Sequence, residues 1–376
     1  MLLELNADQE FLAETTDKFL AKEAPVSVLR ALRDDPAGFD RAYWRAGAEL
    51  GWTSLLVGEA SGGGSVSGRG LMDLTLIAHE FGRHASPGPL AASNVVAAAL
   101  SDQPGDTARS VLEQVISGQA VATWAHEEPG PFAAVSVEVR PDGDEVVITG
   151  RKRPVESAGN ADWLLVTGRS GAGLTQVLVP ADAGGLSVSP LKTVDLTRRF
   201  DTVTFDKVRV PAANVIGGVG EAGPAVASLV DQALVVQCAE SVGAMQSGFD
   251  MTVEWSFDRY SFGRPLASYQ ALKHRFADMK SWLEASHAIT DAAADAVDAG
   301  APDGSTLVSA AKAFVGHYGA ELLQDCVQLH GGIGVTFDHD IHIYLRRMTL
   351  NRMLLGTPSD HRMRLGDQAL AQAEGA

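Results

Sequence analysis

The segment VQLHGGIGVTF, from Val327 to Phe337, interrupts a helical pattern near the end of this chain, and the fold of the C-terminal region is inferred from that break. The amphipathic run AAKAFVGHYGAELLQDCVQLH leads into the segment, and the helix-like run DHDIHIYLRRM follows it. Between the two runs stand Gly331, Gly332 and Gly334. Glycine frees the backbone and removes the side chain. The break is therefore either a cap that joins two helices or a place where a ligand approaches the backbone closely.

Long helical patterns surround this break and define a C-terminal region from residue 218 to residue 376. Pro224 suits the first turn of a helix that runs to Arg259 and would be about 54 Å long. Further helices are expected over Tyr269–Ala299, Ser305–His330, His339–Met353 and Ser359–Ala373. Successive long helices of this kind predict a bundle of antiparallel helices.

The middle region, residues 118–217, consists of short β-branched runs that often alternate between apolar and polar residues. These runs are AVATWAH, VSVEVR, EVVITGR, DWLLVTG, TQVLVP, LSVSPL and DTVTFDKVRV. Turn sequences such as PDGD, GRSGAG and DAGG separate several of them. Repeated short strands with such turns predict an antiparallel β-barrel or sandwich.

The N-terminal region, residues 1–117, has helical periodicity, with Asn6 or Asp8 able to cap its first helix. Its loop GEASGGGSVSGRG could cradle a phosphate, but it lacks the lysine of a P-loop and is interpreted as a surface loop. The fold class that follows is an α+β multidomain protein. A helical domain comes first, a β domain second and a long-helix bundle third.

The chain of 376 residues has a formal net charge of −17, with 45% hydrophobic and 20% charged residues. So acidic a chain lacks the basic face that a nucleic acid or an anionic membrane requires, so neither partner is expected. The most apolar window, Ala225 to Met245, contains Asp231 and Glu240, so a buried helix is expected there and not a membrane span. No metal site is assigned.

Both cysteines, Cys238 and Cys326, lie in apolar helical patterns and are expected to be buried free thiols. Free thiols fit a reducing compartment. The N-terminal sequence MLLELNADQEF has neither the basic nor the apolar region of a signal peptide. A cytoplasmic protein is the expectation.

Three motifs give the chain a resemblance to the acyl-CoA dehydrogenase family of flavoproteins over essentially its whole length. They are RYSFGRPLASYQALKHRFADM from Arg259 to Met279, QLHGGIG from Gln328 to Gly334, and FDKVRVPAANVIG from Phe205 to Gly217. The resemblance implies α,β-dehydrogenation of an acyl-CoA thioester. In that chemistry a carboxylate removes the α-proton and FAD accepts the β-hydride.

The resemblance also implies an oligomer, because in this family the segment like QLHGGIG lies against the ADP part of an FAD held mainly by the neighbouring subunit. A broken helix exposes backbone amides to a pyrophosphate, and glycines allow it to approach. Arg259 would pair with phosphate oxygens, and Gln270 and Gln328 would anchor the nucleotide. The implied cofactor contacts are Arg259, Phe262, Gln270, Gln328, Gly331, Gly332 and Thr357.

The segments that would hold this subunit's own flavin ring depart from the family pattern. Where the family has a T-E-P-x-x-G-S-D-like loop, this chain reads AHEEPGPFA from Ala125 to Ala133, without the Gly-Ser-Asp portion. Where the family has K-x-W-I-T, the chain reads Lys152-Arg153-Pro154-Val155-Glu156. The platform for the ring is therefore degraded, while the segments that reach a neighbour are kept.

The catalytic base is also missing from its usual places, so no catalytic residue is assigned with confidence. Many members carry a glutamate before a Gly-Thr pair, where this chain has Leu355. Other members carry it on the long helix, at the position of Ala233. Asp231 lies about 200° around that helix from Ala233, and Glu240 shares the face of Ala233 about 10 Å along the axis. Glu240 is the remaining candidate base, with a structural ion-pair partner as the other interpretation.

These losses favour an FAD-dependent acyl-CoA dehydrogenase that works as the base-lacking partner in an α2β2 assembly with a homologous catalytic subunit. Family assemblies of this kind often act on steroid side chains or other bulky acyl groups. A homo-oligomer with an unusual base remains open. The alternative from another class is a flavin-free binding or scaffold protein derived from the family.

Overall fold

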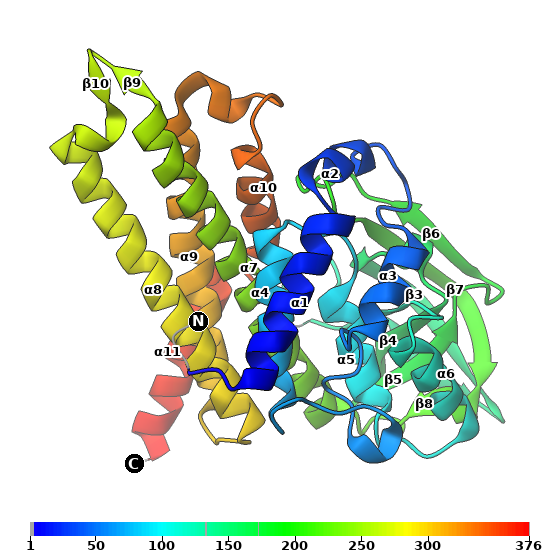
Figure 1. The fold of residues 1–376 in the computed structure, drawn as a ribbon. Helices are drawn as coiled ribbons and strands as arrows, with labels where there is room; N and C mark the ends of the chain where they lie inside the picture. The colour runs from blue at the N-terminus through cyan, green and yellow to red at the C-terminus, as the bar shows by residue number, and fades with distance from the viewer. Residues whose placement is uncertain (1–3, 132–133, 172, 376) are drawn as a thin grey trace.

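The computed structural model describes residues 4–131, 134–171 and 173–375, and it contains the three expected regions in the expected order (Figure 1). The helical bundle lies on one side and the sheet on the other, and two N-terminal helices, Ala7–Glu23 and Gly70–Arg83, stand between them (Figure 1). The domain limits at residues 117 and 217 stay predictions, although α6 ends at Ile116 and the short strand β8 ends at Ile216.

The N-terminal region begins with a helix whose cap the sequence indicated. The Asn6 side chain accepts a hydrogen bond from the Gln9 amide at 2.9 Å, and the Gln9 side chain accepts one from the Asn6 amide at 3.2 Å. This reciprocal pair satisfies two amides at the helix start. The helices are α1 (Ala7–Glu23), α2 (Val26–Leu32), α3 (Arg41–Glu49), α4 (Gly70–Arg83), α5 (Leu90–Leu100) and α6 (Asp106–Ile116), with a 3-10 turn at Glu59–Ser61.

The glycine-rich loop before α4 is held by an acidic residue of the protein. The amide and hydroxyl of Ser67 donate to the buried carboxylate of Asp73 at 3.0 and 2.7 Å. A carboxylate at this place does not favour an anionic phosphate. The interpretation of Gly58–Gly70 as a connecting loop therefore has a physical basis.

The middle region is one mixed sheet in the order β6-β7-β3-β2-β4-β5-β8, with β1 also paired to β4. Its strands are β1 (Ala122–Ala125), β2 (Glu138–Asp142), β3 (Glu145–Glu156), β4 (Trp163–Ser170), β5 (Gly173–Pro180), β6 (Leu186–Pro190), β7 (Phe200–Pro211) and β8 (Val215–Ile216). The expected β domain is present, but the pairing is not antiparallel throughout. Strands β1 and β2 both run parallel to β4, because long connections separate them from it.

The C-terminal region is the expected bundle, and its helices begin and end within two residues of the predicted limits. They are α7 (Gly223–Asp258), α8 (Gln270–Asp298), α9 (Gly304–His330), α10 (Ile341–Asn351) and α11 (Pro358–Gly375). A small hairpin of β9 (Tyr260–Ser261) and β10 (Arg264–Pro265) joins α7 to α8. Short 3-10 turns lie at Ala158–Asn160, Ala212–Asn214, Leu266–Ser268 and Gly331–Val335.

Helix α7 forms the centre of the molecule and packs against α4, α5, α8, α9 and α10. It is long and apolar enough to cross a membrane, but 67% of its most apolar window is buried inside the protein. At the crossing with α4, a Cβ on Gly82 would come within 1.8 Å of the Glu240 carbonyl oxygen, and one on Gly243 within 1.9 Å of the His79 carbonyl oxygen. Glycines therefore let the two helix backbones touch, which buries this part of α7 as expected.

The two cysteines lie in this packed interior. Cys238 of α7 and Cys326 of α9 are both buried and free, which confirms the expectation. Burial raises the pKa of Cys238 to about 11 and that of Cys326 to about 12, so both remain protonated thiols at neutral pH.

The glycines of the opening segment have different tasks. Helix α9 ends at His330 because Gly331 turns to a φ of +66°, which residues with a side chain rarely adopt. Gly334 is required by packing, since a Cβ there would lie 2.6 Å from the Val327 carbonyl oxygen. Gly332 has neither constraint, because a Cβ there would meet nothing within 4 Å. The fold alone explains Gly331 and Gly334. Gly332 is the glycine that the hypothesis of a ligand close to the backbone would explain.

Candidate functional site

A small cavity lies where the sheet, α5, α7 and the turn between α10 and α11 meet. Its volume is about 60 Å³, and both family base positions, Ala233 and Leu355, line it. This volume is far below the roughly 300–1,000 Å³ that is usual for ligand pockets. The remaining lining residues are Ala91, Ala92, Val95, Trp124, His126, Glu127, Pro154, Glu156, Arg198, Phe200, Gln237 and Leu354.

The residues that replace the family's K-x-W-I-T segment occupy this region. Glu156, at the end of β3, forms a two-point ion pair with Arg198, with distances of 2.5 and 2.7 Å between nitrogen and oxygen. Both side chains are buried, and Pro154 lines the same wall. Burial raises the pKa of Glu156, although the Arg198 guanidinium acts in the opposite direction. A charged pair therefore stands where the family sequence has a threonine.

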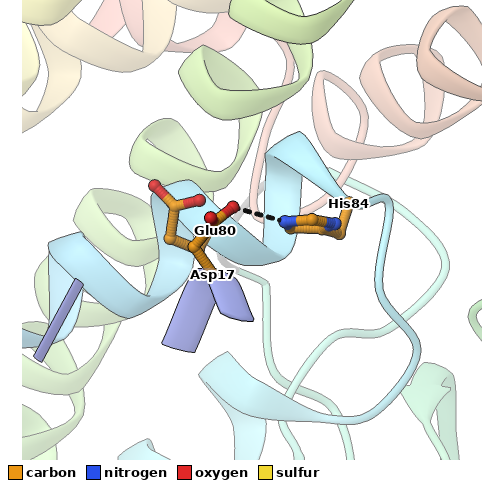
Figure 2. Close-up of side chains that lie close together, drawn as sticks. All are labelled: Asp17, Glu80 and His84. Carbon is orange, nitrogen blue, oxygen red and sulfur yellow. Dashed lines mark hydrogen bonds and ion pairs between the residues drawn. The ribbon is translucent and has the colours of Figure 1, made fainter. Parts of the chain in front are cut away.

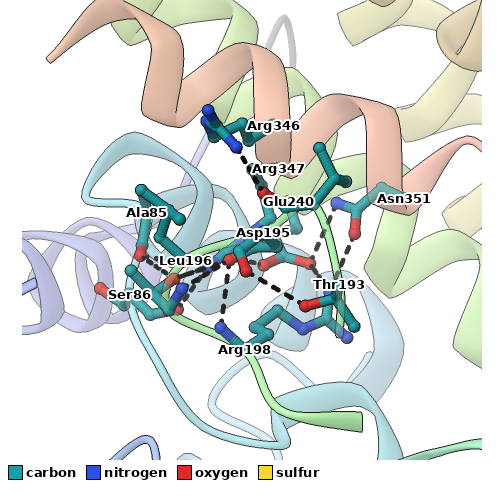
Figure 3. Close-up of polar contacts among 12 residues, drawn as sticks. Ala85, Ser86, Thr193, Asp195, Leu196, Arg198, Glu240, Arg346, Arg347 and Asn351 are labelled. Carbon is teal, nitrogen blue, oxygen red and sulfur yellow. Dashed lines mark hydrogen bonds and ion pairs between the residues drawn. The ribbon is translucent and has the colours of Figure 1, made fainter. Parts of the chain in front are cut away.

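Glu240, the candidate base, belongs to a buried ion-pair network that extends from this pair (Figure 3). One of its carboxylate oxygens accepts from Arg347, and the other accepts from Arg198 at 3.1 Å and from Asn351 at 3.2 Å. Glu240 lines neither cavity described in this section. The geometry therefore favours the structural interpretation of Glu240, and we do not retain it as a base.

Arg347 of α10 holds this network together although it is fully buried. It donates to Asp195 at 2.5 Å and to the carbonyl oxygens of Ala85 and Ser86 at 3.1 and 3.0 Å. Burial raises the pKa of Asp195, but the ion pair with Arg347 outweighs it and holds that pKa below its usual value. The network ties the sheet, α7 and α10 into one rigid wall.

Leu355, at the other base position, has an unusual backbone. Its φ is +54°, a left-handed conformation that costs a bulky residue about 1–3 kcal/mol. Its amide donates to Glu127 at 2.9 Å, and its carbonyl oxygen accepts from the His361 ring at 2.9 Å. Burial lowers the pKa of His361 to about 4, so the ring is a neutral donor at this contact. Both polar groups of this peptide are therefore held by side chains.

Lys312 of α9 fixes the segment just before Leu355. Its buried ammonium donates to the Gln237 side chain and to the carbonyl oxygens of Asn351 and Leu354, the last at 2.8 Å. These three acceptors match the three donors of an ammonium group. Burial lowers the pKa of Lys312 to about 8, which leaves most of the population charged at pH 7. Lys312 therefore joins α9, α7 and the end of α10 around the small cavity.

A second, larger groove lies beside the small cavity and opens to solvent. Its volume is about 870 Å³, within the usual range for ligand pockets. Apolar residues include Val226 and Val230 of α7 and the exposed Met353 and Met363. The charged residues on its wall are Glu127, Glu128, Asp360, Arg364 and Asp367, four acids against one base.

The shortened loop after β1 forms one side of this groove. Glu128 pairs with the buried Lys152 at 2.6 Å and accepts from the amides of Ser136 and Val137 at 2.8 and 3.0 Å. Burial raises the pKa of Glu128, but these contacts, with Lys152 foremost, outweigh it and lower that pKa. The glutamate of the T-E-P pattern thus keeps a structural partner. Phe132 and Ala133, part of the same comparison, lie outside the described residues.

The residues implied to contact a neighbour's cofactor gather mostly at one end of the bundle. Arg259 follows the last residue of α7, Gln270 begins α8, and Gln328 lies in the last turn of α9 (Figure 1). All three side chains are exposed. Phe262 forms the tip of the β9–β10 hairpin with 98% of its surface exposed and a φ of +50°. Strain in an exposed aromatic residue is typical of a contact site.

Thr357 is the exception among the implied contacts. It lines the large groove, and its hydroxyl and amide both donate to Asp360 in the first turn of α11, at 2.7 and 2.8 Å. It therefore serves as a helix cap, and the structure does not bring it together with the residues around Arg259.

The same end of the bundle exposes several large apolar side chains besides Phe262. They are Phe257, Tyr260, Val335 and Phe337, each more than half exposed. Scattered exposed apolar residues are common, but a group around one helical end is typical of a contact surface.

A cluster of Asp17, Glu80 and His84 has the residue types of a metal site (Figure 2). Its ligand atoms lie within 4.8 Å of one another, and His84 bonds to Asp17 at 2.8 Å. Arg83 donates to both carboxylates, at 3.3 Å to Asp17 and 2.9 Å to Glu80. This guanidinium supplies the positive charge that a metal ion would otherwise bring, so the cluster is not assigned as a metal site.

Two residues that sequence reasoning did not single out are central here. Glu127 stands at the threonine position of the T-E-P pattern, and this exchange of residue type was a visible signal. Lys312 gave no such signal, because a lysine within a helical pattern is more often on the surface. Its role depends on the carbonyl groups that other helices place around it.

Comparisons with known proteins agree with this architecture. Residues 6–128 match the family model for the acyl-CoA dehydrogenase N-terminal domain, and residues 225–370 match that for the acyl-CoA dehydrogenase C-terminal domain. Acyl-CoA dehydrogenase IpdE2 of Mycolicibacterium smegmatis is 29% identical over 362 residues, which cover 96% of this chain and 98% of the relative.

Two solved structures are similar over nearly their whole length. One chain of a variant of the Tcur3481–Tcur3483 steroid ACAD is 30% identical with a TM-score of 0.89, and the match covers 98% of this chain and 99% of that one. Butyryl-CoA dehydrogenase of Megasphaera elsdenii has a TM-score of 0.89 at 20% identity, covering 98% and 100%, which supports the fold alone. The chain therefore belongs to the acyl-CoA dehydrogenase family of oxidoreductases acting on CH–CH groups.

Proposed function

We propose that this chain is the base-lacking partner subunit of a heteromeric, FAD-dependent acyl-CoA dehydrogenase, assembled with a homologous catalytic subunit. The observation that carries the proposal is the 60 Å³ cavity, which both family base positions line with Ala233 and Leu355 in place of a carboxylate. Neither side chain can accept a proton from the α-carbon of a thioester.

The chain's own flavin-ring region does not fit the cofactor. A cavity of about 60 Å³ is far smaller than the usual ligand pocket, and the Glu156–Arg198 pair occupies the wall where the family sequence has a threonine. On the adjoining groove Glu128 is already paired with Lys152, and Asp360 and Asp367 outnumber Arg364, so the groove offers a pyrophosphate no net positive charge. We therefore derive no step through a flavin ring held by this chain.

The outward end of the bundle does fit the ADP part of a cofactor held by a neighbour. Arg259 is exposed and can donate to phosphate oxygens, and Gly332 leaves open space where a backbone amide can meet them. Gln270 and Gln328 are exposed at the same end. The chemistry that FAD supplies in this family is acceptance of a hydride from the acyl group. The task of this chain is to bind and orient the far end of the cofactor.

The substrate class that we propose is an acyl-CoA with a bulky, steroid-like acyl group, handled in the cytoplasm. The support is the 30% identity to a chain described as part of a steroid ACAD, together with two buried free thiols. That steroid ACAD is described by two protein designations, Tcur3481 and Tcur3483, which supports a heteromeric assembly for this chain as well.

Co-purification tests this function against its alternative. The chain is expressed alone and together with a homologue that has a glutamate at the position of Leu355, and flavin absorbance is measured for each. Flavin bound only by the pair supports the partner role. Stable assembly of the pair with no dependence of flavin content on this chain supports the flavin-free scaffold instead.

A further inference from the structure

Glu127 stands in the wall between the small cavity and the large groove. Among the residues that the structure describes, three line both spaces: His126, Glu127 and Leu355. His126 is stacked on Trp124 with ring centroids 4.3 Å apart, so its ring is fixed against the sheet. Leu355 is fixed through both of its backbone polar groups. Glu127 is thus the residue whose side chain crosses from one fixed wall to the other.

The contact that closes this wall joins residues far apart in the sequence. Glu127 lies in the loop after β1, and Leu355 lies in the turn between α10 and α11. The Glu127 carboxylate accepts a hydrogen bond from the Leu355 amide at 2.9 Å. Burial raises the pKa of Glu127 to about 7, while the Leu355 amide and Lys312 lower it. A carboxyl group that is readily neutral can stay in this apolar passage at modest cost.

We propose that Glu127 is the specificity-determining residue that keeps the ring of a flavin out of this subunit, by closing the passage from the groove to the ring region. The family pattern has the shorter threonine at this position, which cannot span to the Leu355 amide. Glu127 therefore separates a groove of ligand size from a remnant of about 60 Å³. The inference rests on the proposed function, because it explains how a partner subunit leaves the flavin ring to the catalytic subunit.

The experiment uses the full chain and lumiflavin, which carries the isoalloxazine ring without phosphates and so avoids the acidic groove wall. Binding is measured by equilibrium dialysis and by quenching of flavin fluorescence, since Trp124 lines the ring region. Glu127→Thr opens the passage, and Glu127→Gln keeps both the length and an acceptor for the Leu355 amide. We expect the Thr variant to bind lumiflavin at least about tenfold more tightly than the wild type, and the Gln variant to match the wild type.

Two further variants locate the ring and separate size from charge. Glu127→Asp keeps the charge on a shorter side chain, so intermediate binding is expected. Adding Trp124→Phe to Glu127→Thr should preserve binding but reduce quenching, because the ring then no longer lies against an indole. Folding of each variant is checked by circular dichroism and thermal unfolding, and the Asp variant carries the test if the Thr variant does not fold.

The outcomes distinguish this inference from the proposed function. Folded Thr and Asp variants that bind no better than wild type would overturn the role of Glu127 and leave the partner role standing. A Gln variant that gains as much as the Thr variant would show that charge, and not length, excludes the ring. Wild-type chain that purifies alone with a bound, fully quenched flavin would overturn the proposed function itself.

Discussion

The inner cavity and the outer end of the helical bundle differ in how their polar side chains are paired. In the inner region, Glu156 pairs with Arg198, and Glu127 accepts a hydrogen bond from the Leu355 amide. At the outer end, Arg259, Phe262 and Gln328 are exposed. Side chains that pair internally stabilise the chain, while exposed polar and aromatic side chains are available to a partner. The contrast suggests that this subunit has exchanged a site of its own for a contribution to its neighbour's.

The largest expected effect concerns activity. The chain alone should convert acyl-CoAs at least about 10²- to 10⁴-fold more slowly than the chain with its catalytic partner, because a general base is absent from both usual positions. Anaerobic titration with several acyl-CoAs, followed by flavin bleaching, measures this. Rapid bleaching in the isolated chain would contradict the division of labour. Glu127→Gln would then be the first substitution to make, since Glu127 is a carboxyl group on the cavity wall whose hydrogen bond comes from a backbone amide.

The next prediction tests whether the filled inner region is structural. Arg198→Met leaves the buried Glu156 carboxylate without its partner and should lower the free energy of unfolding by about 3–5 kcal/mol. Urea unfolding measures the change. The matched control is Arg209→Met, which removes an exposed arginine paired with Asp142 and Glu145 and should give little measurable change. Equal effects of the two substitutions would contradict the assigned role of the buried pair.

At the outer end, Arg259→Ala should weaken FAD retention by the assembly about tenfold or more while leaving the fold intact, because a charge-assisted hydrogen bond to phosphate is lost. Flavin content after dialysis and a titration with FAD provide the measurement. Arg264→Ala is the control, on the hairpin that follows Arg259, where Arg264 lies over the Tyr269 ring at 3.8 Å from its centroid. Unchanged FAD affinity in the complex that carries the Arg259 variant would contradict the proposal that this chain contacts the ADP part of FAD held by its neighbour.

The glycines allow a comparison within one segment. Gly332→Val should reduce FAD retention without lowering thermal stability, since a side chain there meets nothing within 4 Å in this chain but blocks close approach from outside. Gly334→Val should instead lower the unfolding temperature, because its Cβ would lie 2.6 Å from a carbonyl oxygen. Loss of stability in the Gly332 variant would contradict close approach of a cofactor and would favour the interpretation of this segment as a helix cap.

The last prediction is a pH dependence of stability. The folded-state pKa of Glu127 is raised to about 7, above its unfolded value near 4.5, so the folded chain favours the neutral carboxyl. Wild-type stability relative to Glu127→Gln should therefore be greatest below pH 4.5 and fall as the pH rises to 7, by about 3 kcal/mol. Urea unfolding of both proteins at several pH values measures this difference. A constant difference across that range would mean that Glu127 does not titrate as assigned.

The sequence by itself determined the order of the three regions and the limits of the long helices. The physical reason is that helical periodicity, capping residues such as Asn6, and glycine breaks such as Gly331 act within a few residues of one another. The motifs around Arg259 and Gln328 also identified the family from local patterns alone. Pairing of β1 and β2 with β4 escaped prediction, because parallel neighbours are chosen by contacts between distant segments.

Only the tertiary structure decided what the inner residues do. Glu240 was a possible base in the sequence, and its role became clear once Arg198 and Arg347 were seen to donate to its two oxygens from other elements. The task of Lys312 follows from carbonyl groups that α10 and its following turn supply. Glu127 and Leu355 stand 228 positions apart, and their contact closes a passage that neither segment encodes alone. Burial and partner choice are properties of the assembled fold, because the free energy of a buried polar group depends on which acceptors and donors the fold brings to it.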